Sequence, residues 1–236
     1  MDRIRAVLFD IDGTLLDSND ASAHAWLDAL RGHGKEVPYD RVRSAIGGGG
    51  AKLLREVADI DADSVLGRSI NDRRIAILKA HYVPDLGPHP GARALVDRIR
   101  SRGLVCAAVS SAGSAEIDDL LKAAAVFDLI DLVVSSNDAD PESNLVDVAL
   151  ERLRIEPNEA IFVGDTRYDV AAATRVGMPI IAFRCGGSTD DDLEGALAIY
   201  DGPADLLTHF GDSPIAQALE STRPPPFPRR SAAREY

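Results

Sequence analysis

A short apolar run that ends in two aspartates constrains the fold of this chain more than any other stretch. Residues 6–9, Ala-Val-Leu-Phe, lead directly into Asp10, Ile11 and Asp12. Such a run predicts a buried strand, and open α/β sheets bind their ligands at the carboxyl ends of strands. Two carboxylates this close repel each other and favour a cation between them. The alternative interpretation is an Asp-Gly turn that closes a hairpin.

A second acidic pair lies far downstream. Residues 160–163, Ala-Ile-Phe-Val, predict another buried strand, which is followed by Gly164, Asp165 and Asp169. Two acids four residues apart at the start of a helix can face one centre. Acids in a first helical turn also suit the helix dipole, which is the purely structural explanation.

Composition excludes several classes of partner. The chain has 236 residues, 45% of them hydrophobic, and a formal net charge of −12. That charge disfavours nucleic acid and anionic membranes, which reward clustered Lys and Arg. No stretch approaches the roughly 20 apolar residues of a membrane span. The start of the chain lacks signal-peptide features, and the two cysteines, Cys106 and Cys185, are expected to be reduced, buried thiols, so we predict a cytoplasmic protein.

Periodicity predicts alternating helices and strands from residue 89 onward. Further strands are expected at 104–109, 130–134, 180–183 and 198–200, and helices at 92–102, 145–153 and 204–210. The first of these strands ends in Ser110-Ser111-Ala112-Gly113. Hydroxyls at this position can bind a phosphoryl oxygen, although Ser is also a common helix N-cap.

Residues 17–88 differ from the rest because they show no strand signal. Helices are expected at 21–31, 41–46, 52–58 and 68–82, with Pro84–Pro90 as the connection back. A run of four glycines, 47–50, precedes Lys52. Gly48, Gly49 and Lys52 are candidates for contact with a substrate, and a flexible helix connector is the alternative.

These motifs together resemble a known family. The stretch Asp10–Ser18 resembles the first motif of the haloacid dehalogenase-like (HAD) hydrolase superfamily, Ser110 matches its second, and Gly164-Asp165-x-x-x-Asp169 resembles its fourth. The resemblance covers roughly residues 4–210 and implies a three-layer, Rossmann-like α/β core with a mainly parallel sheet. That core would comprise 1–16 and 89–212, with 17–88 as a small inserted helical cap of the type in phosphoglycolate phosphatase and beta-phosphoglucomutase. The Pro- and Arg-rich tail, 222–236, is expected to be disordered.

The resemblance also implies Mg²⁺-dependent transfer of a phosphoryl group. Asp10 would attack phosphorus, and Asp12 would protonate the leaving group and then activate water. The implied metal residues are Asp10, Asp12 through its carbonyl, Asp165 and Asp169, and the implied phosphate-binding residues are Thr14, Ser110 and Ser111. An acid at position 12 argues for phosphate and against halide, since halide needs no proton. The expected partner is a small phosphorylated metabolite, and the expected assembly is a monomer or a homodimer.

One motif of the superfamily is missing. A lysine is expected before the fourth strand, but its place falls on Asp140, and no lysine follows Lys122. Loss of one preorganised charge typically lowers a rate by about 10²–10³. Arg167, Arg175, Lys122 or Lys52 could supply the charge instead. The alternative functions are a catalytically impaired relative that binds a ligand or protein, and, with less support, a sugar-phosphate mutase.

Overall fold

A computed structural model describes residues 4–140 and 143–220 of the chain. Its centre is a parallel sheet of six strands in the order β3-β2-β1-β4-β5-β6. The strands are β1 (Ala6–Phe9), β2 (Val105–Val109), β3 (Leu132–Val134), β4 (Ala160–Gly164), β5 (Ile180–Phe183) and β6 (Ala198–Tyr200). The predicted α/β fold with a parallel sheet is confirmed.

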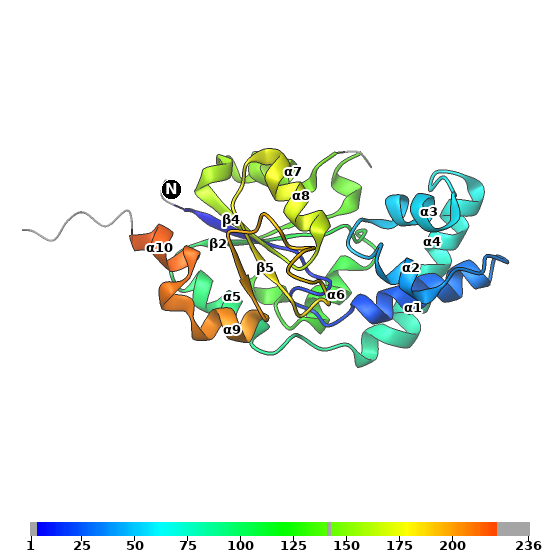
Figure 1. Ribbon diagram of the computed structural model, residues 1–236, viewed down its shortest axis with the longest axis horizontal. Helices are drawn as coiled ribbons and strands as arrows, with labels where there is room; N and C mark the ends of the chain where they lie inside the picture. Colours follow the sequence, from blue (N-terminus) through cyan, green and yellow to red (C-terminus); the bar gives the residue numbers. More distant parts are fainter. Residues whose placement is uncertain (1–3, 141–142, 221–236) are drawn as a thin grey trace, which may run out of the picture.

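Helices cover both faces of the sheet, as Figure 1 shows. On one face lie α5 (Ala92–Arg100), α6 (Ile117–Ala123), α9 (Pro203–Thr208) and α10 (Pro214–Glu220). On the other face lie α7 (Leu145–Leu153) and α8 (Arg167–Val176). Successive residues of β1 alternate between the two cores, with Val7 in the first and Leu8 in the second. Burial on both faces explains why the strands are continuous apolar runs rather than alternating ones.

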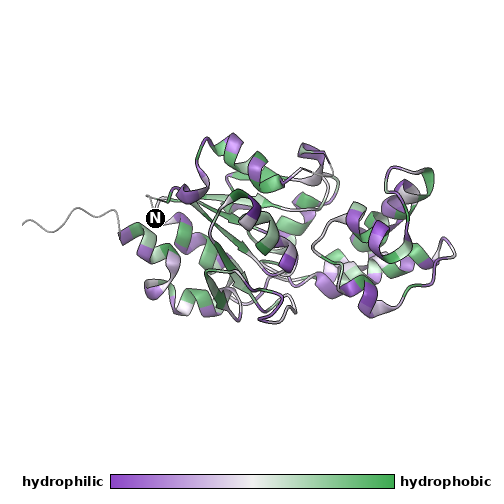
Figure 2. Ribbon diagram, turned by 45° about the horizontal axis from the view of Figure 1, so that its top comes forward, coloured by the Kyte–Doolittle hydropathy of each residue, from purple (hydrophilic) through white to green (hydrophobic). Residues whose placement is uncertain are grey.

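The remaining helices form a separate group at one end of the molecule (Figures 1 and 2). They are α1 (Asn19–Arg31), α2 (Tyr39–Arg43), α3 (Gly50–Ala58) and α4 (Val65–Ile77), and we call them the cap. The cap has its own apolar cluster, which includes Trp26, Leu53 and Ile70. The domain boundaries at 17–88 stay a prediction.

The two connections between cap and core run side by side. Asp17 N–H donates to the carbonyl of Gly87 (3.1 Å), and His89 N–H donates to that of Leu15 (2.9 Å). The two chain connections between cap and core are therefore hydrogen-bonded to each other, directly beyond β1.

Some predicted boundaries were inexact. The expected helix at 68–82 begins earlier, at Val65, because Ser64 accepts a hydrogen bond from Gly67 N–H and caps it. It ends at Ile77 and continues as a wider π-helical turn, Leu78–Tyr82, and a 3₁₀ turn, Val83–Asp85. Helix α10 was not predicted. The tail at 222–236 lies outside the described residues, and within them no helix is long and apolar enough to cross a membrane.

Candidate active site

Asp10 lies at the carboxyl end of β1, where the strand order reverses. Its backbone N–H donates to the carbonyl of Val163 on β4 (2.9 Å). Strands β2 and β4 flank β1, so the segments that follow all three strands meet at this edge of the sheet. This is the topological switch point at which parallel sheets bind ligands.

The chain turns sharply after Asp12. Gly13 adopts φ +82°, which is a conformation that favours glycine. A Cβ at this position would lie 2.3 Å from Asp165 Oδ2. Gly13 is therefore required both for the turn and for the close approach of the Asp165 carboxylate.

Three carboxylates converge at this edge. Asp10, Asp165 and Asp169 each offer one oxygen, and these oxygens lie within 4.8 Å of one another. Burial, followed by the charges of Asp169, Asp165 and Asp12, raises the pKa of Asp10 well above its usual range. Burial and then Asp169 also raise the pKa of Asp165. These three carboxyl groups cannot readily ionise together without a cation nearby. Mg²⁺ prefers carboxylate oxygens as ligands, so the three residues fit this metal.

Neutral donors hold this cluster in place. Thr14 Oγ1 donates to Asp165 Oδ1 (2.8 Å) and lies 3.3 Å from Asp10 Oδ2, and Asn19 Nδ2 donates to Asp165 Oδ2 (2.9 Å). The Thr14 side chain is fully buried. Its single hydroxyl proton is engaged with carboxylates, so Thr14 positions the Asp165 side chain. The expected contact between Thr14 and phosphate stays a prediction.

Asp169 is positioned by the start of α8. Its Oδ2 accepts hydrogen bonds from Thr166 N–H (2.9 Å), Thr166 Oγ1 (2.7 Å) and Asp165 N–H (3.2 Å). Thr166 is the N-cap and Asp169 the third helical residue, so the two form a capping box. Asp169 can therefore serve the helix and the cluster at once. Its Oδ2 caps α8, and its carboxylate also belongs to the three-carboxylate cluster.

Asp12 is not a member of the three-carboxylate cluster found among the described residues. Ser18 Oγ donates a short hydrogen bond to its Oδ1. Burial raises the pKa of Asp12, while the hydrogen bond from Ser18 partly opposes this rise. A carboxyl group whose pKa is raised is suited to hold a proton and pass it on.

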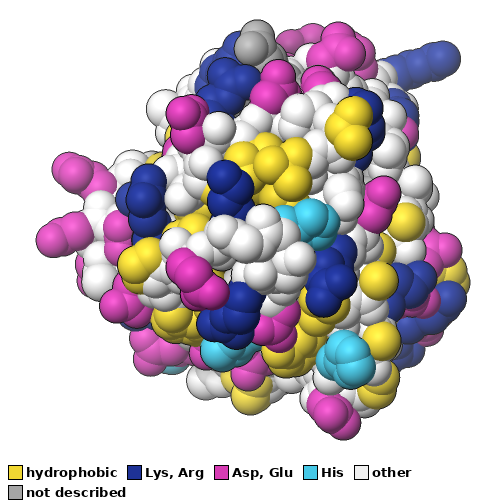
Figure 3. Space-filling view, turned by 90° about the vertical axis from the view of Figure 1, so that its right-hand side faces the viewer, with side chains coloured by type: hydrophobic (Ala, Val, Ile, Leu, Met, Phe, Trp, Pro, Cys, Tyr) yellow, Lys and Arg dark blue, Asp and Glu magenta, His cyan; other side chains and the backbone are white. Residues whose placement is uncertain are grey.

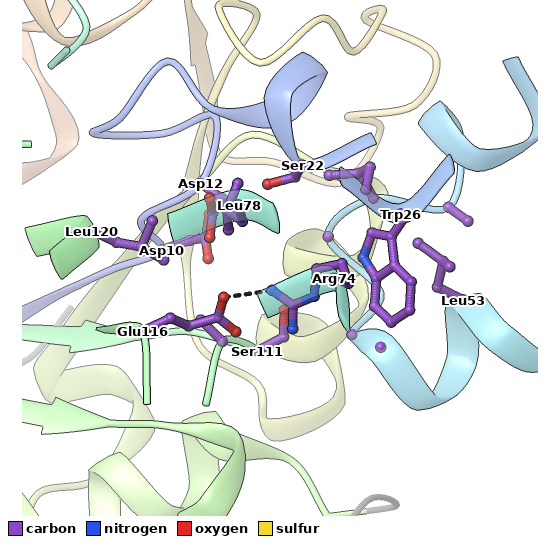
Figure 4. Close-up of a pocket in the computed structure, with 16 residues that line it drawn as sticks. Asp10, Asp12, Ser22, Trp26, Leu53, Arg74, Leu78, Ser111, Glu116 and Leu120 are labelled. Atoms are coloured by element: carbon purple, nitrogen blue, oxygen red, sulfur yellow. Dashed lines mark hydrogen bonds and ion pairs between the residues drawn. The ribbon is translucent and has the colours of Figure 1, made fainter. Parts of the chain in front are cut away.

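Two cavities meet at Asp10. The first, of about 60 Å³, also touches Asp12, Ser111 and, from the cap, Trp26 and Arg74. Figure 4 shows the two aspartates at one end of this cavity and Trp26 and Leu53 at the other. The second, of about 310 Å³, touches Asp169, Lys52 and the residues that begin α7. Asp10 is thus accessible from the side of Asp12 and from the side of the three-carboxylate cluster.

The two serines after β2 have different surroundings. Ser111 lines both cavities. Ser110 is only 2% exposed, and its Oγ accepts a hydrogen bond from Ala112 N–H (3.1 Å). Ser110 therefore organises the loop locally, and a contact between its hydroxyl and phosphate stays a prediction.

The glycine run of the cap rests on the core beside Asp10. An added Cβ at Gly47 would meet Thr166 at 2.7 Å, one at Gly48 would meet the Tyr168 ring at 3.0 Å, and one at Gly49 would meet Ser111 at 3.5 Å. Gly47 and Gly49 line the first cavity, and Gly47 and Gly48 line the second. The structure thus brings Gly48, Gly49 and Lys52 to the site, although their contact with substrate is untested.

The segment that would carry the missing lysine also reaches the site, but not at the predicted residue. Asp140 is exposed and lines neither cavity. Ser143 and Asn144, which directly precede α7, line the cavity that holds Asp10 and Asp169. Asn144 also caps α7 by accepting from Val146 N–H.

Sequence reasoning missed a charged pair in the first cavity. Arg74 of α4 donates to Glu116, which directly precedes α6 (2.5 Å). Their side chains are 12% and 1% exposed. Arg74 also lies over the Trp26 ring, 5.0 Å from its centroid. No local pattern marked either residue, because the pair forms between segments 42 positions apart.

A parallel α/β sheet with an acidic centre at its switch point, covered by a helical cap, defines a hydrolase of the HAD type. The chain belongs to the haloacid dehalogenase-like hydrolase family, whose sequence profile matches residues 7–183. The family resemblance expected from the motifs is confirmed.

Named relatives agree with this assignment. The chain is 32% identical over 199 residues to a phosphoglycolate phosphatase of Nitrosospira multiformis, covering 80% of this chain and 87% of the relative. It is 31% identical over 222 residues to a phosphoglycolate phosphatase of Rhodospirillum rubrum, covering 88% and 91%. The crystal structure of a hydrolase from Pseudomonas syringae superposes with a TM-score of 0.81 at 25% identity, covering 88% and 98%. These relatives agree with an enzyme of the phosphatase type.

Proposed function

We infer that this protein hydrolyses a small phosphomonoester with the help of Mg²⁺, through an aspartyl-phosphate on Asp10. The observation that supports this most is the convergence of Asp10, Asp165 and Asp169 beside an Asp12 of raised pKa. A nucleophile, a cation site and a proton donor are thereby present within one site.

Asp10 and Asp12 divide the chemistry. An Asp10 oxygen attacks phosphorus, and the bond between phosphorus and the ester oxygen breaks. Asp12 gives its proton to that oxygen and so releases an alcohol. Asp12 then takes a proton from water, whose oxygen attacks phosphorus and frees Asp10 and inorganic phosphate. Ser18, which donates to Asp12 Oδ1, would hold the acid in place during both steps.

Asp10, Asp165 and Asp169 would hold Mg²⁺, with the Asp12 carbonyl as a further ligand. The bound ion supplies positive charge next to the transferring phosphoryl group. Thr14 and Asn19 orient the Asp165 carboxylate, as outer-shell hydrogen bonds do at metal sites generally.

The substrate is expected to be small. The cavity that touches Asp12, where the leaving group would lie, has a volume of about 60 Å³ and is also lined by Trp26 and Leu53 of the cap and by Leu78. Two relatives are named for activity on phosphoglycolate, which is a compact substrate of this kind. The catalytically impaired relative is not favoured, since Asp10, Asp165 and Asp169 converge and Asp12 lines a cavity that also touches Asp10. We expect a cytoplasmic protein that acts on a free metabolite.

Phosphate release tests this proposal. Phosphoglycolate and a panel of sugar and polyol phosphomonoesters would be supplied to the wild-type chain and to Asp10→Asn, with Mg²⁺ or with EDTA. We expect turnover of at least one substrate that requires both Mg²⁺ and Asp10. Release that persists in Asp10→Asn, or absence of release by the wild type, would contradict the proposal.

A further inference from the structure

The site carries more negative charge than its own core residues offset. Asp10, Asp165 and Asp169 converge, and Asp12 lines a cavity that also touches Asp10. Within residues 4–140 and 143–220, none of the four forms an ion pair with Lys or Arg. The hydrogen bonds they accept come from hydroxyl, amide and backbone groups. A phosphoryl group would add further negative charge, and a single divalent cation cannot balance all of it.

The face of the molecule at the cap end does not present a general positive field. Figure 3 looks onto the cap and shows basic and acidic side chains interspersed, with neither sign dominating the face. An individual side chain close to Asp10 can supply the compensating charge locally. Arg74, which lines the first cavity with Asp10, is already paired with Glu116.

The cavity on the Asp169 side of Asp10 is the place where such a charge could act. It is bounded by Ser111, Asn144 and Asp169, and its volume of about 310 Å³ leaves room for a long side chain. Two basic residues line it, Lys52 and Arg175. The other two cations considered from the sequence are engaged elsewhere. Lys122 lies over the Phe127 ring, and Arg167 donates to the Ser44 carbonyl.

Lys52 is better placed than Arg175. Arg175 lies six residues after Asp169 on α8, which corresponds to roughly 9 Å along the helix axis. Lys52 lies in the first turn of α3, directly after the glycine run that rests on Tyr168 and Ser111. The cap thus holds the backbone of Lys52 beside the cavity.

Lys52 makes only weak contacts, which a stronger interaction with a bound phosphoryl group could replace. Its Nζ lies 4.3 Å from the Tyr168 ring centroid and 3.9 Å from Glu56 Oε1. The Lys52 and Glu56 side chains are 50% and 42% exposed, so solvent screens this pair. Lysine has a flexible stem with a compact charge, and its amine can turn from Glu56 toward a phosphoryl group bound at Asp10.

We propose that Lys52 of the cap supplies the positive charge that the core lacks, by binding the phosphoryl oxygens of the substrate at Asp10. This inference rests on the proposed function. It implies that the charge balance of the site is complete only when the cap is seated on the core, so cap position and phosphoryl binding are coupled. No bond to Lys52 forms or breaks.

The test compares Lys52→Gln with Arg175→Gln as a matched control from the same cavity. Steady-state kinetics with Mg²⁺ gives kcat and KM, and calorimetry gives the affinity of the Mg²⁺-loaded protein for orthovanadate, a phosphoryl mimic. We expect Lys52→Gln to lower kcat by about 10²–10³ and to weaken orthovanadate binding by at least about 10-fold. Arg175→Gln should change either quantity by less than about two-fold. Wild-type behaviour of Lys52→Gln in both measurements, or the larger loss in Arg175→Gln, would overturn the proposal.

A second-site variant separates charge from structure. Asn144 belongs to the core and lines the same cavity as Lys52, Asp10 and Asp169. Adding Asn144→Lys to Lys52→Gln should restore at least a tenth of the wild-type kcat. Failure of both Asn144→Lys and Lys52→Arg to restore any activity would contradict a role through charge. Orthovanadate binding reports on Lys52 even in a chain without turnover, so failure of the inference and failure of the proposed function are distinguishable.

Discussion

Arg74 of the cap donates to Glu116 of the core inside the cavity that contains Asp10 and Asp12. Figure 4 shows this ion pair crossing the space between cap and core, next to Ser111. Both side chains are largely buried, and Arg74 Nε has no hydrogen-bond partner among the described residues. The pair therefore joins the two parts of the molecule at the point where a leaving group would lie.

Arg74→Gln is expected to lower the free energy of unfolding by about 1–3 kcal/mol, because it leaves the buried Glu116 carboxylate without its charged donor. Glu116→Gln should also lower it, because it leaves the largely buried Arg74 guanidinium without its anionic partner. In the double variant, the coupling energy between the two positions should exceed about 0.5 kcal/mol. Chemical denaturation of the four chains measures it, and strictly additive effects would contradict the pairing.

Gly186→Ala should remove Asp165 from its position. A Cβ at residue 186 would lie 1.6 Å from Asp165 Oδ2, which is too close for any packing adjustment of the side chain alone. We expect a loss of about 1–3 kcal/mol in stability and weaker Mg²⁺ binding by calorimetry. Gly211→Ala is the control, because nothing lies within 4 Å of that position. Equal Mg²⁺ affinity in both variants would show that Asp165 does not bind the ion.

Thr14→Val should weaken Mg²⁺ binding by about 10-fold or more, in the range typical of lost outer-shell hydrogen bonds. The substitution keeps the volume of the side chain but removes the proton donated to Asp165 Oδ1. Thr14→Ser retains that donor and should bind Mg²⁺ nearly as the wild type does. If the serine variant loses as much affinity as the valine variant, packing rather than the hydroxyl is responsible.

The metal-free protein should lose stability as pH rises. Burial and neighbouring carboxylates raise the pKa of Asp10 and of Asp165, whereas both titrate near about 3.9 in the unfolded chain. The folded state therefore binds protons more tightly. This contribution to stability is complete below the unfolded pKa and disappears as pH rises through the raised folded values.

Mg²⁺ should reverse that loss, because it binds the ionised carboxylates. The increase in Tm on replacing EDTA with Mg²⁺ is expected to be larger near pH 8 than near pH 5, and smaller at both in Asp165→Asn. Calorimetric scans at the two pH values provide the comparison. A gain in Tm that does not depend on pH would indicate that Mg²⁺ binding is not linked to these protons.

The sequence predicted the sheet and its acidic edge well, for a physical reason. Strands such as residues 160–163 are buried on both faces, so their continuous apolar character and abrupt acidic ends are visible in the sequence itself. Parallel topology then brings the acids after β1 and β4 together without further information.

Other parts of the site depend on tertiary geometry. The Arg74–Glu116 pair joins positions that no periodicity relates, and the Thr14 hydroxyl could have pointed to a ligand rather than to two carboxylates. The place of the missing lysine was predicted at Asp140 by counting along the chain, whereas Ser143 and Asn144 reach the cavity. Asn144 caps α7 and so determines which residues before the helix reach the cavity. This cap depends on the three-dimensional structure and could not be counted along the chain.

Trapping of the phosphorylated nucleophile tests the mechanism most directly. Borohydride reduces an aspartyl-phosphate to homoserine, which mass spectrometry distinguishes from aspartate in the peptide that contains residue 10. The wild-type chain, quenched during turnover of a phosphomonoester with Mg²⁺, should carry homoserine at position 10, and the chain treated without substrate should not. Turnover with aspartate unmodified at position 10 and homoserine at another position would contradict Asp10 as the nucleophile.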